Sequence, residues 1–363
     1  MKEWQKGIRE VIPYTPGEQP RFDKMIKLNT NENPYPPSPK VEEALRNIDV
    51  DKQRLYPDFA GTELIEALSK VYDVPKECIF FGIGSDDVLS MAVLTFFNTG
   101  KPILFPDITY SFYDVWAGLY KIPFKALPLD EDFRLVKEDY YSEKNPNGGV
   151  VIANPNAPTS IAESADFIED IIKHNQDSVV IVDEAYVDFG GESVLPLIKK
   201  YDNLLVVRTF SKSRSMAGMR IGYAFGNAEL IKALNDVKYS FNSYTLNMTA
   251  ITTGAASALD EEYFEKTCRK IIATREEYKK KLEKLGFYVL DSKTNFLFAS
   301  PGGAKFDSNR AEETRKLFEA LKKENIFVRY FNKPRINEFL RITIGTPEQM
   351  ETFIKFVENY INV

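Results

Sequence analysis

The sequence LLVVRTFSKSRSMAGMRIGYAF, residues 204–225, sets the pattern from which the rest of the chain can be interpreted. Its apolar, β-branched start predicts a buried strand, and the apolar run after Arg220 predicts a second one. Between them, a polar loop carries Lys212, and the hydroxyl residues Thr209 and Ser211 come just before it. Hydroxyl donors, a guanidinium fork and a lysine amine suit a phosphorylated ligand that bears an aldehyde. A strand followed by a basic, solvated loop explains the same residues without any ligand.

Short apolar runs recur through the first two thirds of the chain, and helical or mixed segments separate most of them. The runs do not alternate with polar residues, which is typical of strands buried on both faces of a mostly parallel sheet. We therefore predict an α/β fold whose large domain has such a sheet flanked by helices. Ligands of these sheets bind at the carboxyl ends of the strands. The runs are 79–83, 103–105, 124–127, 150–153, 179–182 and 204–207, and helical segments are expected at 62–71, 87–97, 110–119 and 165–174.

The chain divides into three regions by its composition and periodicity. Residues 1–40 are rich in Pro and Asn and predict an extended N-terminal arm that begins the small domain. Residues 41–255 form the predicted large domain, and 256–363 a smaller C-terminal α/β domain. A long helical stretch is expected at 243–285. After it, strands are expected at 287–290, 296–298, 326–329 and 340–344, with a helix at 312–324.

The composition excludes several classes of function. A formal net charge of −6 over 363 residues gives no reason to expect nucleic-acid or membrane-surface binding. The two cysteines, Cys78 and Cys268, are far apart, and His174 is the only histidine, so we expect no metal site and no catalytic triad built on several histidines. Neither a signal peptide nor an apolar run of about 18 residues occurs, and we expect a cytoplasmic enzyme.

Further candidate site residues follow the apolar runs. Ser85 and Asp86 open a helix after a strand, where free backbone N–H groups can bind phosphate. Asp183 ends a buried run, where a carboxylate is costly unless a cation pairs with it, and Tyr186 lies three residues on. Asn156 follows another run and could donate to a phenolate oxygen. Helix capping and turn formation explain these residues without a ligand.

Two arginines in the C-terminal region lie beside strand-like runs. Arg329 follows the run at 326–328, and Arg341 opens the run Arg-Ile-Thr-Ile. An arginine in this position suggests an anionic ligand, and a structural salt bridge is the alternative.

The ordered set GSDD, NPNAPTS, DEAY and TFSKS, followed by Arg220, resembles the fold-type I pyridoxal-phosphate aminotransferases of class I/II. Within them, LNTNENPYPPSP, LYPD, DEAYVDF, RTFSKSRSMAGMRIGY and LRITIGTPEQ are similar to the histidinol-phosphate aminotransferases. The similarity covers nearly the whole chain. It implies pyridoxal 5′-phosphate as cofactor, and amino-group transfer from L-histidinol phosphate to 2-oxoglutarate in histidine biosynthesis. Products would be imidazole acetol phosphate and L-glutamate.

The resemblance also implies roles for individual residues. Lys212 would be the Schiff-base lysine, and Asp183 would pair with the pyridine nitrogen. Tyr186 and Asn156 would hold the phenolic oxygen of the ring, and Tyr110 would stack on the ring. The cofactor phosphate would be bound by Ser85, Asp86, Thr209, Ser211 and Arg220, and by Tyr56 from the neighbouring subunit of a homodimer.

On the substrate side, the resemblance implies that Arg341 meets the anionic end, while Arg329 and Tyr14 help to select a phosphate. The chain departs from the family pattern Asn-Asn-Pro-Thr-Gly at Ala157 and Ser160. A threonine-phosphate decarboxylase or an aromatic aminotransferase would have the same fold. A cofactor-binding regulator would also need a DNA-binding module, and the arm is short and not basic.

Overall fold

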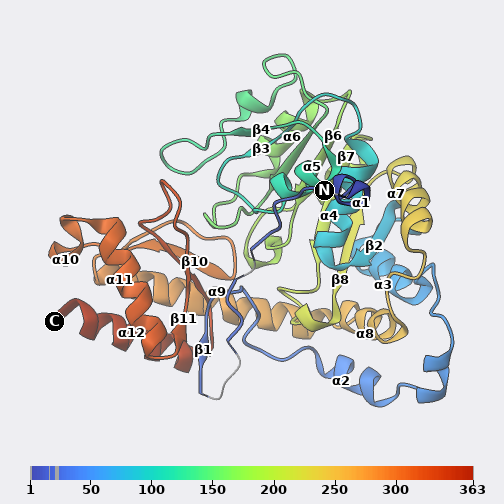
Figure 1. Ribbon diagram of the computed structural model, residues 1–363. Helices are drawn as coiled ribbons and strands as arrows, with labels where there is room; N and C mark the ends of the chain where they lie inside the picture. The colour runs from blue at the N-terminus through green and yellow to red at the C-terminus, as the bar shows by residue number, and fades with distance from the viewer. Residues whose placement is uncertain (1, 16, 21–23, 363) are drawn as a thin grey trace.

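The computed structural model describes residues 2–15, 17–20 and 24–362 of the chain. Figure 1 shows a larger α/β part and a smaller one, and helix α9 (Glu261–Lys284) runs between the two. The strands of the larger part are, in chain order, β2 (Ile79–Ile83), β3 (Ile103–Pro106), β4 (Phe124–Leu127), β5 (Gly149–Ala153), β6 (Val179–Asp183), β7 (Leu204–Thr209) and β8 (Ile221–Phe225).

Within the described residues, these strands form one seven-stranded sheet in the order β2-β8-β7-β6-β5-β3-β4. Strands β7, β6, β5, β3 and β4 pair in parallel, whereas β8 pairs antiparallel with both β2 and β7. The predicted mostly parallel sheet is therefore confirmed. Because β8 runs against its neighbours, the residue that precedes it lies at the same edge of the sheet as the residues that follow the parallel strands.

Both faces of the sheet are covered, which explains the unbroken apolar runs. Along β6, Val180 and Val182 pack into one hydrophobic cluster and Ile181 into another on the opposite face, as the two-residue repeat of a strand requires. Helices α3 (Thr62–Tyr72), α6 (Ala165–Lys173) and α8 (Met248–Ala258) supply the first cluster. The second contains residues of α4 (Gly84–Phe96), α5 (Tyr113–Tyr120) and α7 (Ala228–Phe241).

The smaller part has an antiparallel sheet in the order β12-β13-β10-β9. Beside it, a strand from the N-terminal arm pairs in parallel with a strand from the C-terminal region, so both ends of the chain build this part. The strands are β1 (Ile26–Lys27), β9 (Tyr288–Val289), β10 (Phe296–Ser300), β11 (Ile326–Phe327), β12 (Arg329–Tyr330) and β13 (Leu340–Thr343). The helices are α9, α10 (Ala304–Asp307), α11 (Arg310–Lys323) and α12 (Pro347–Asn362).

Four expected elements differ from those observed. The strand expected at 326–329 is two short strands, β11 and β12, which belong to different sheets. The arm is not wholly irregular, because it contains α1 (Glu3–Lys6) and β1 and leads into α2 (Pro39–Arg46). The helix expected at 110–119 begins only at Tyr113. The stretch 243–285 is two helices, α8 and α9, and Asp260 lies between them with its carboxylate accepting from the Ser38 hydroxyl and paired with Lys40. Among the helices of the described residues, none has both the length and the apolar character of a membrane span.

The start of α4 packs so closely against strand β8 that Gly222 of this strand has no room for a side chain. A Cβ on Gly222 would lie 2.2 Å from the carbonyl carbon of Gly84 and 2.3 Å from the backbone nitrogen of Ser85. We therefore expect Gly222→Ala to lower the free energy of unfolding by about 1–3 kcal/mol. Urea unfolding followed by circular dichroism measures this. Gly218→Ala is the matched control, because a Cβ there meets no atom within 4 Å. Equal stability of the two variants would contradict the prediction.

Candidate active site

Residues that follow different strands meet at one edge of the large sheet. Asp183 is the last residue of β6, and Thr209 is the last residue of β7. Ser85 lies in the first turn of α4, directly after β2. Arg220 immediately precedes β8, whose antiparallel direction brings it to the same edge. This arrangement matches the expectation that ligands of such sheets bind at the carboxyl ends of the strands.

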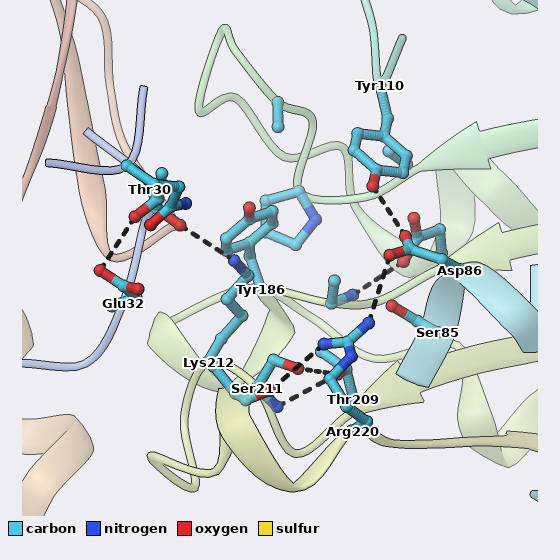
Figure 2. A pocket seen from close by; sticks show the side chains of 17 residues that line it. Thr30, Glu32, Ser85, Asp86, Tyr110, Tyr186, Thr209, Ser211, Lys212 and Arg220 are labelled. Carbon is cyan, nitrogen blue, oxygen red and sulfur yellow. Dashed lines mark hydrogen bonds and ion pairs between the residues drawn. The ribbon is translucent and has the colours of Figure 1, made fainter. Parts of the chain in front are cut away.

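A cavity of about 220 Å³ lies at this edge. Figure 2 shows the side chains around it: the Lys212 amine lies beside Tyr186, with Thr30 and Glu32 on one side and Arg220, Ser85 and Asp86 on the other. The predicted site residues that line the cavity are Ser85, Asp86, Tyr110, Asp183, Tyr186, Thr209, Ser211, Lys212 and Arg220. The structure therefore brings together nine residues that lie up to 135 positions apart in the chain, from Ser85 to Arg220.

One end of the cavity is suited to an anion. Gly84 begins α4 with a φ of +81°, so the first backbone N–H groups of a 13-residue helix face this end. The Arg220 guanidinium lies so close that a Cβ on Gly84 would be 2.5 Å from its Nη2. Thr209 and Ser211 add hydroxyl groups, whose oxygens are 3.0 Å apart. The donors here are a helix start, a guanidinium and two hydroxyls, which together fit a phosphate.

Asp86 occupies part of this anion-binding end. Its carboxylate lies 3.4 Å from Nη2 of Arg220 and accepts a 2.7 Å hydrogen bond from the Tyr110 hydroxyl. Burial and the Asp86 charge raise the pKa of Tyr110, so this hydroxyl stays protonated and donates. Asp86 thus partly balances the charge of Arg220, and Tyr110 is held against the wall of the cavity (Figure 2).

Asp183 supplies a buried carboxylate at the other side of the cavity. Its oxygens accept from the Tyr113 hydroxyl at 3.1 Å and from the Ala185 backbone N–H at 3.1 Å. Burial raises the pKa of Asp183 to about 6, and the nearby charges of Asp86 and Glu184 act in the same direction. Among the described residues it has no cationic partner within ion-pair distance, so a ligand with a protonated ring nitrogen would supply the missing charge.

Lys212 projects into the cavity from the loop after β7. Its Nζ donates to the Thr30 carbonyl at 3.3 Å and lies 5.6 Å from the centre of the Tyr186 ring. The Asn33 side chain donates to the Lys212 carbonyl at 3.0 Å, which fixes the backbone of the lysine. No carboxylate of the described residues forms an ion pair with its amine. An amine held this way is free to react with a ligand.

A second cavity adjoins the first and is lined by Tyr14, Arg329 and Arg341 together with Tyr186 and Lys212. Arg341 donates to the Asn29 carbonyl at 2.8 Å, while its Nε is buried without a partner. Burial lowers the pKa of Arg341, and the charge of Arg329 adds to this effect. In the part of the chain that the structure describes, neither arginine pairs with a carboxylate, so the structural salt bridge considered from the sequence is not seen there. Two adjacent guanidiniums would bind an anionic substrate group.

Asn156 is not among the residues that line either cavity, and its contact with a ring oxygen stays a prediction. Its amide donates to the Ile108 carbonyl and to the Thr159 hydroxyl, at 2.9 Å each, and its carbonyl oxygen accepts from Thr109. Both amide hydrogens are therefore used within the protein. Ala157, which replaces the family asparagine, lines the cavity instead and has no polar side chain.

Tyr56 also lies outside both cavities of this subunit. It is 80% exposed, and its ring stacks on Tyr244 with 4.6 Å between ring centres. This position agrees with a residue that reaches another subunit.

Apart from Tyr14, sequence reasoning missed the residues of the N-terminal arm that face the site. Thr30 and Glu32 line the first cavity, and Asn31 lines the second. The prolines and asparagines of the arm predict irregular structure, and its apolar side chains predict an extended segment that packs on another surface. The motif Asn-Glu-Asn-Pro was the available signal, since buried asparagines need hydrogen-bond partners, but their partners lie far away in the sequence.

The whole chain was compared with known proteins. Residues 23–357 match the family model described as aminotransferase class I and II. The chain belongs to the class I and II aminotransferases. The histidinol-phosphate aminotransferase of Lactococcus lactis subsp. cremoris MG1363 is 52% identical over 358 residues, which cover 99% of this chain and 98% of the relative. That of Acinetobacter baylyi is 48% identical, over 100% and 98% of the two chains.

A solved structure supports the fold of this aminotransferase. The crystal structure of histidinol-phosphate aminotransferase from Sinorhizobium meliloti, in complex with pyridoxal 5′-phosphate, matches with a TM-score of 0.84 at 21% identity. The match covers 92% of this chain and 90% of the other. Independently of that match, the cavity here fits such a cofactor, because an amine, a buried carboxylate without a cation and a phosphate-type donor set surround one space.

The raised pKa of Asp183 predicts a pH effect in the ligand-free aminotransferase. Between about pH 4 and pH 6 the folded protein keeps a proton on Asp183 that the unfolded chain releases, so stability falls as the pH rises. Compared with Asp183→Asn, which cannot ionise, the wild type should lose about 3 kcal/mol of unfolding free energy from pH 4 to pH 7. Urea unfolding of both proteins across this range measures the difference. A constant difference would show that Asp183 has an ordinary pKa.

Proposed function

We propose that this aminotransferase uses pyridoxal 5′-phosphate to transfer the amino group of L-histidinol phosphate to 2-oxoglutarate, giving imidazole acetol phosphate and L-glutamate. The observation that carries the proposal is the position of Lys212. Lys212 lines the same cavity as Asp183, which pairs with no cation among the described residues, and as the phosphate-type donors around Arg220, and it also lines the adjoining cavity of Arg329 and Arg341. The relatives with about half of their residues identical are named histidinol-phosphate aminotransferases.

The chemistry follows from the position of each side chain. When bound, pyridoxal phosphate supplies an aldehyde that links to amines and a ring that accepts an electron pair. Asp183 would keep the ring nitrogen protonated, because the buried carboxylate stabilises the positive charge of the protonated ring. Tyr186 would donate to the ring oxygen. Arg220, with Ser85 and its helix N-terminus, would bind the phosphate.

Lys212 has two roles in this proposal. Its amine would hold the cofactor before the substrate arrives. The substrate amine would then replace the Lys212 amine on the cofactor. The released amine of Lys212 would take the proton from the substrate Cα and deliver it to C4′ of the cofactor. Its loop position suits this work, because Asn33 fixes its backbone and the side chain remains free to turn.

On the substrate side, Arg341 would bind the anionic end of both substrates in turn, with Arg329 and Tyr14 selecting the phosphate of histidinol phosphate. Tyr14 is placed for this by stacking on Phe112, with 4.1 Å between ring centres. One anion site for a phosphate and a carboxylate would let the same cavity serve both halves of the reaction.

We further propose a homodimer in the cytoplasm, in which Tyr56 reaches the phosphate site of the partner. Its exposed ring is part of an aromatic surface with Phe59, Tyr239, Phe241 and Tyr244, which a partner subunit would cover. We propose the domain division 1–40, 41–255 and 256–363. In its favour, the strands of the large sheet lie within 79–225, and those of the smaller part lie before residue 28 or after residue 287.

Two half-reactions test the function. The absorbance of the bound cofactor should change to that of its amino form when L-histidinol phosphate is added, and 2-oxoglutarate should reverse the change. Lys212→Ala should lower turnover by more than about 10³-fold, because the proton-transfer group is lost. Release of carbon dioxide from L-threonine phosphate, with the aldehyde form unchanged, would instead assign the decarboxylase reaction.

Arg341→Ala tests the shared anion site. Loss of a charge-assisted contact should raise the KM for histidinol phosphate and for 2-oxoglutarate by roughly 10- to 100-fold each, because both anions would use the same guanidinium. Steady-state kinetics with each substrate varied in turn measures this. An unchanged KM for 2-oxoglutarate would show that the two anions bind to different groups.

A further inference from the structure

Asn31 lies where the N-terminal arm passes between the two parts of the molecule. Its side chain is 1% exposed, and its backbone has a φ of +57°. Asparagine tolerates this left-handed conformation better than most residues, because its short polar side chain can form local hydrogen bonds. The residue is thus fixed in both backbone and side chain, although the arm that carries it was expected to be irregular.

The polar groups of Asn31 contact both parts of the protein. On the side of the smaller part, its backbone N–H donates to the Thr343 hydroxyl at 3.0 Å, and the Asn295 amide donates to its carbonyl at 3.0 Å. On the side of the large sheet, its side-chain amide donates to the hydroxyl of Tyr186 at 2.9 Å. Asn31 therefore links strand β13, which carries Arg341, to a tyrosine that lines both cavities.

The Thr343 hydroxyl determines which way the Asn31 amide points. This hydroxyl donates its only hydrogen to Oδ1 of Asn31 at 3.0 Å. The amide oxygen is therefore on the side of Thr343, and the NH₂ group faces Tyr186. Because Tyr186 accepts from this NH₂ group, its own O–H hydrogen points elsewhere, and no acceptor among the described residues takes it.

In this chain, the hydrogen bond to the ring oxygen depends more on Tyr186 than the family pattern would suggest. Of the residues considered for the ring-oxygen contact, Asn156 has both amide hydrogens committed, and Ala157 offers no donor. This leaves the Tyr186 hydroxyl, and its usefulness depends on the direction of a single hydrogen. A group that sets this direction acts on the cofactor without touching it.

We propose that Asn31 is a positioning residue for the cofactor: its amide occupies the acceptor side of the Tyr186 hydroxyl, so that the hydroxyl donates to the ring oxygen. The inference rests on the proposed pyridoxal phosphate cofactor. A donor to the ring oxygen stabilises its negative charge and weakens its hold on the proton of the lysine–cofactor linkage. Asn31 therefore lowers the pKa of that linkage through Tyr186, and the Thr343 hydroxyl supports it.

The test is a pH titration of the absorbance of the resting, cofactor-loaded protein. In Asn31→Asp the carboxylate accepts from the Tyr186 hydroxyl and turns its hydrogen away from the ring oxygen. In Asn31→Gly the backbone conformation is kept, but the amide is lost. We expect the pKa of the lysine–cofactor linkage to rise by about one unit in the Asp variant and by less in the Gly variant. The Kd of the ligand-free protein for pyridoxal phosphate should rise in both.

A double-mutant cycle with Tyr186→Phe separates this effect from that of a new negative charge. Tyr186→Phe alone should raise the pKa of the linkage, and adding Asn31→Gly or Asn31→Asp should raise it little further. A full additional shift for Asn31→Asp in the Phe background would mean that charge alone acts, which would overturn the proposal. Asn295→Ala is the control, because it loses a bond to the Asn31 carbonyl and leaves the Tyr186 contact in place.

The remaining outcomes are also decisive. If both Asn31 variants unfold at lower temperature and the pKa of the linkage is unchanged, Asn31 only holds the two parts together and the proposal is wrong. If the wild type shows no pH-dependent absorbance that disappears in Lys212→Ala, the proposed cofactor itself is wrong. The first outcome leaves the wild-type titration intact, so the two failures can be told apart.

Discussion

The cost of burying the Asp183 carboxylate is the constraint on which the site depends. Asp183 and Glu184 are neighbours at the end of β6, and both are buried. Glu184 is compensated within the protein, because it pairs with Arg208 at 2.8 Å and accepts from Ser193. Among the described residues, Asp183 accepts from a tyrosine hydroxyl and a backbone N–H and pairs with no cation. The two adjacent acids thus have different roles: Glu184 pairs with a cation of the protein, whereas Asp183 is available to a ligand.

The surrounding structure supports this difference. The Arg208 guanidinium also lies 3.8 Å from Asp188, and Asp188 accepts from the Ser213 hydroxyl, next to Lys212. The ion pair of Glu184 and Arg208 therefore helps to fix the loop that carries Lys212. From the other side, Asn33 of the arm holds the Lys212 carbonyl. Loops from distant parts of the chain are held by buried polar contacts, which a parallel sheet with covered faces makes possible.

Much of the fold could be predicted from the sequence, because apolar runs report directly on strands that are buried on both faces. The same logic located Asp183, Lys212 and Arg220, since each is adjacent to such a run. It did not anticipate that the Asn156 amide donates to the carbonyl of Ile108 in another loop. It also missed Asn31, because its partner Thr343 is 312 residues away. A pattern along the chain predicts where a side chain lies more readily than which way its polar atoms point.

The two adjoining cavities are lined by different charged residues. The first contains a carboxylate at one side and Arg220 at its far end, so a ligand with a cationic ring and an anionic tail would match both. The second holds Arg329 and Arg341, where burial lowers the pKa of Arg341 and the nearby charge of Arg329 acts in the same direction. An anion that binds there relieves the repulsion of the guanidiniums. Strand β13 carries both Arg341 and Thr343, and Thr343 orients Asn31. The same strand therefore fixes Arg341, which would receive the substrate anion, and Asn31, which directs the Tyr186 hydroxyl.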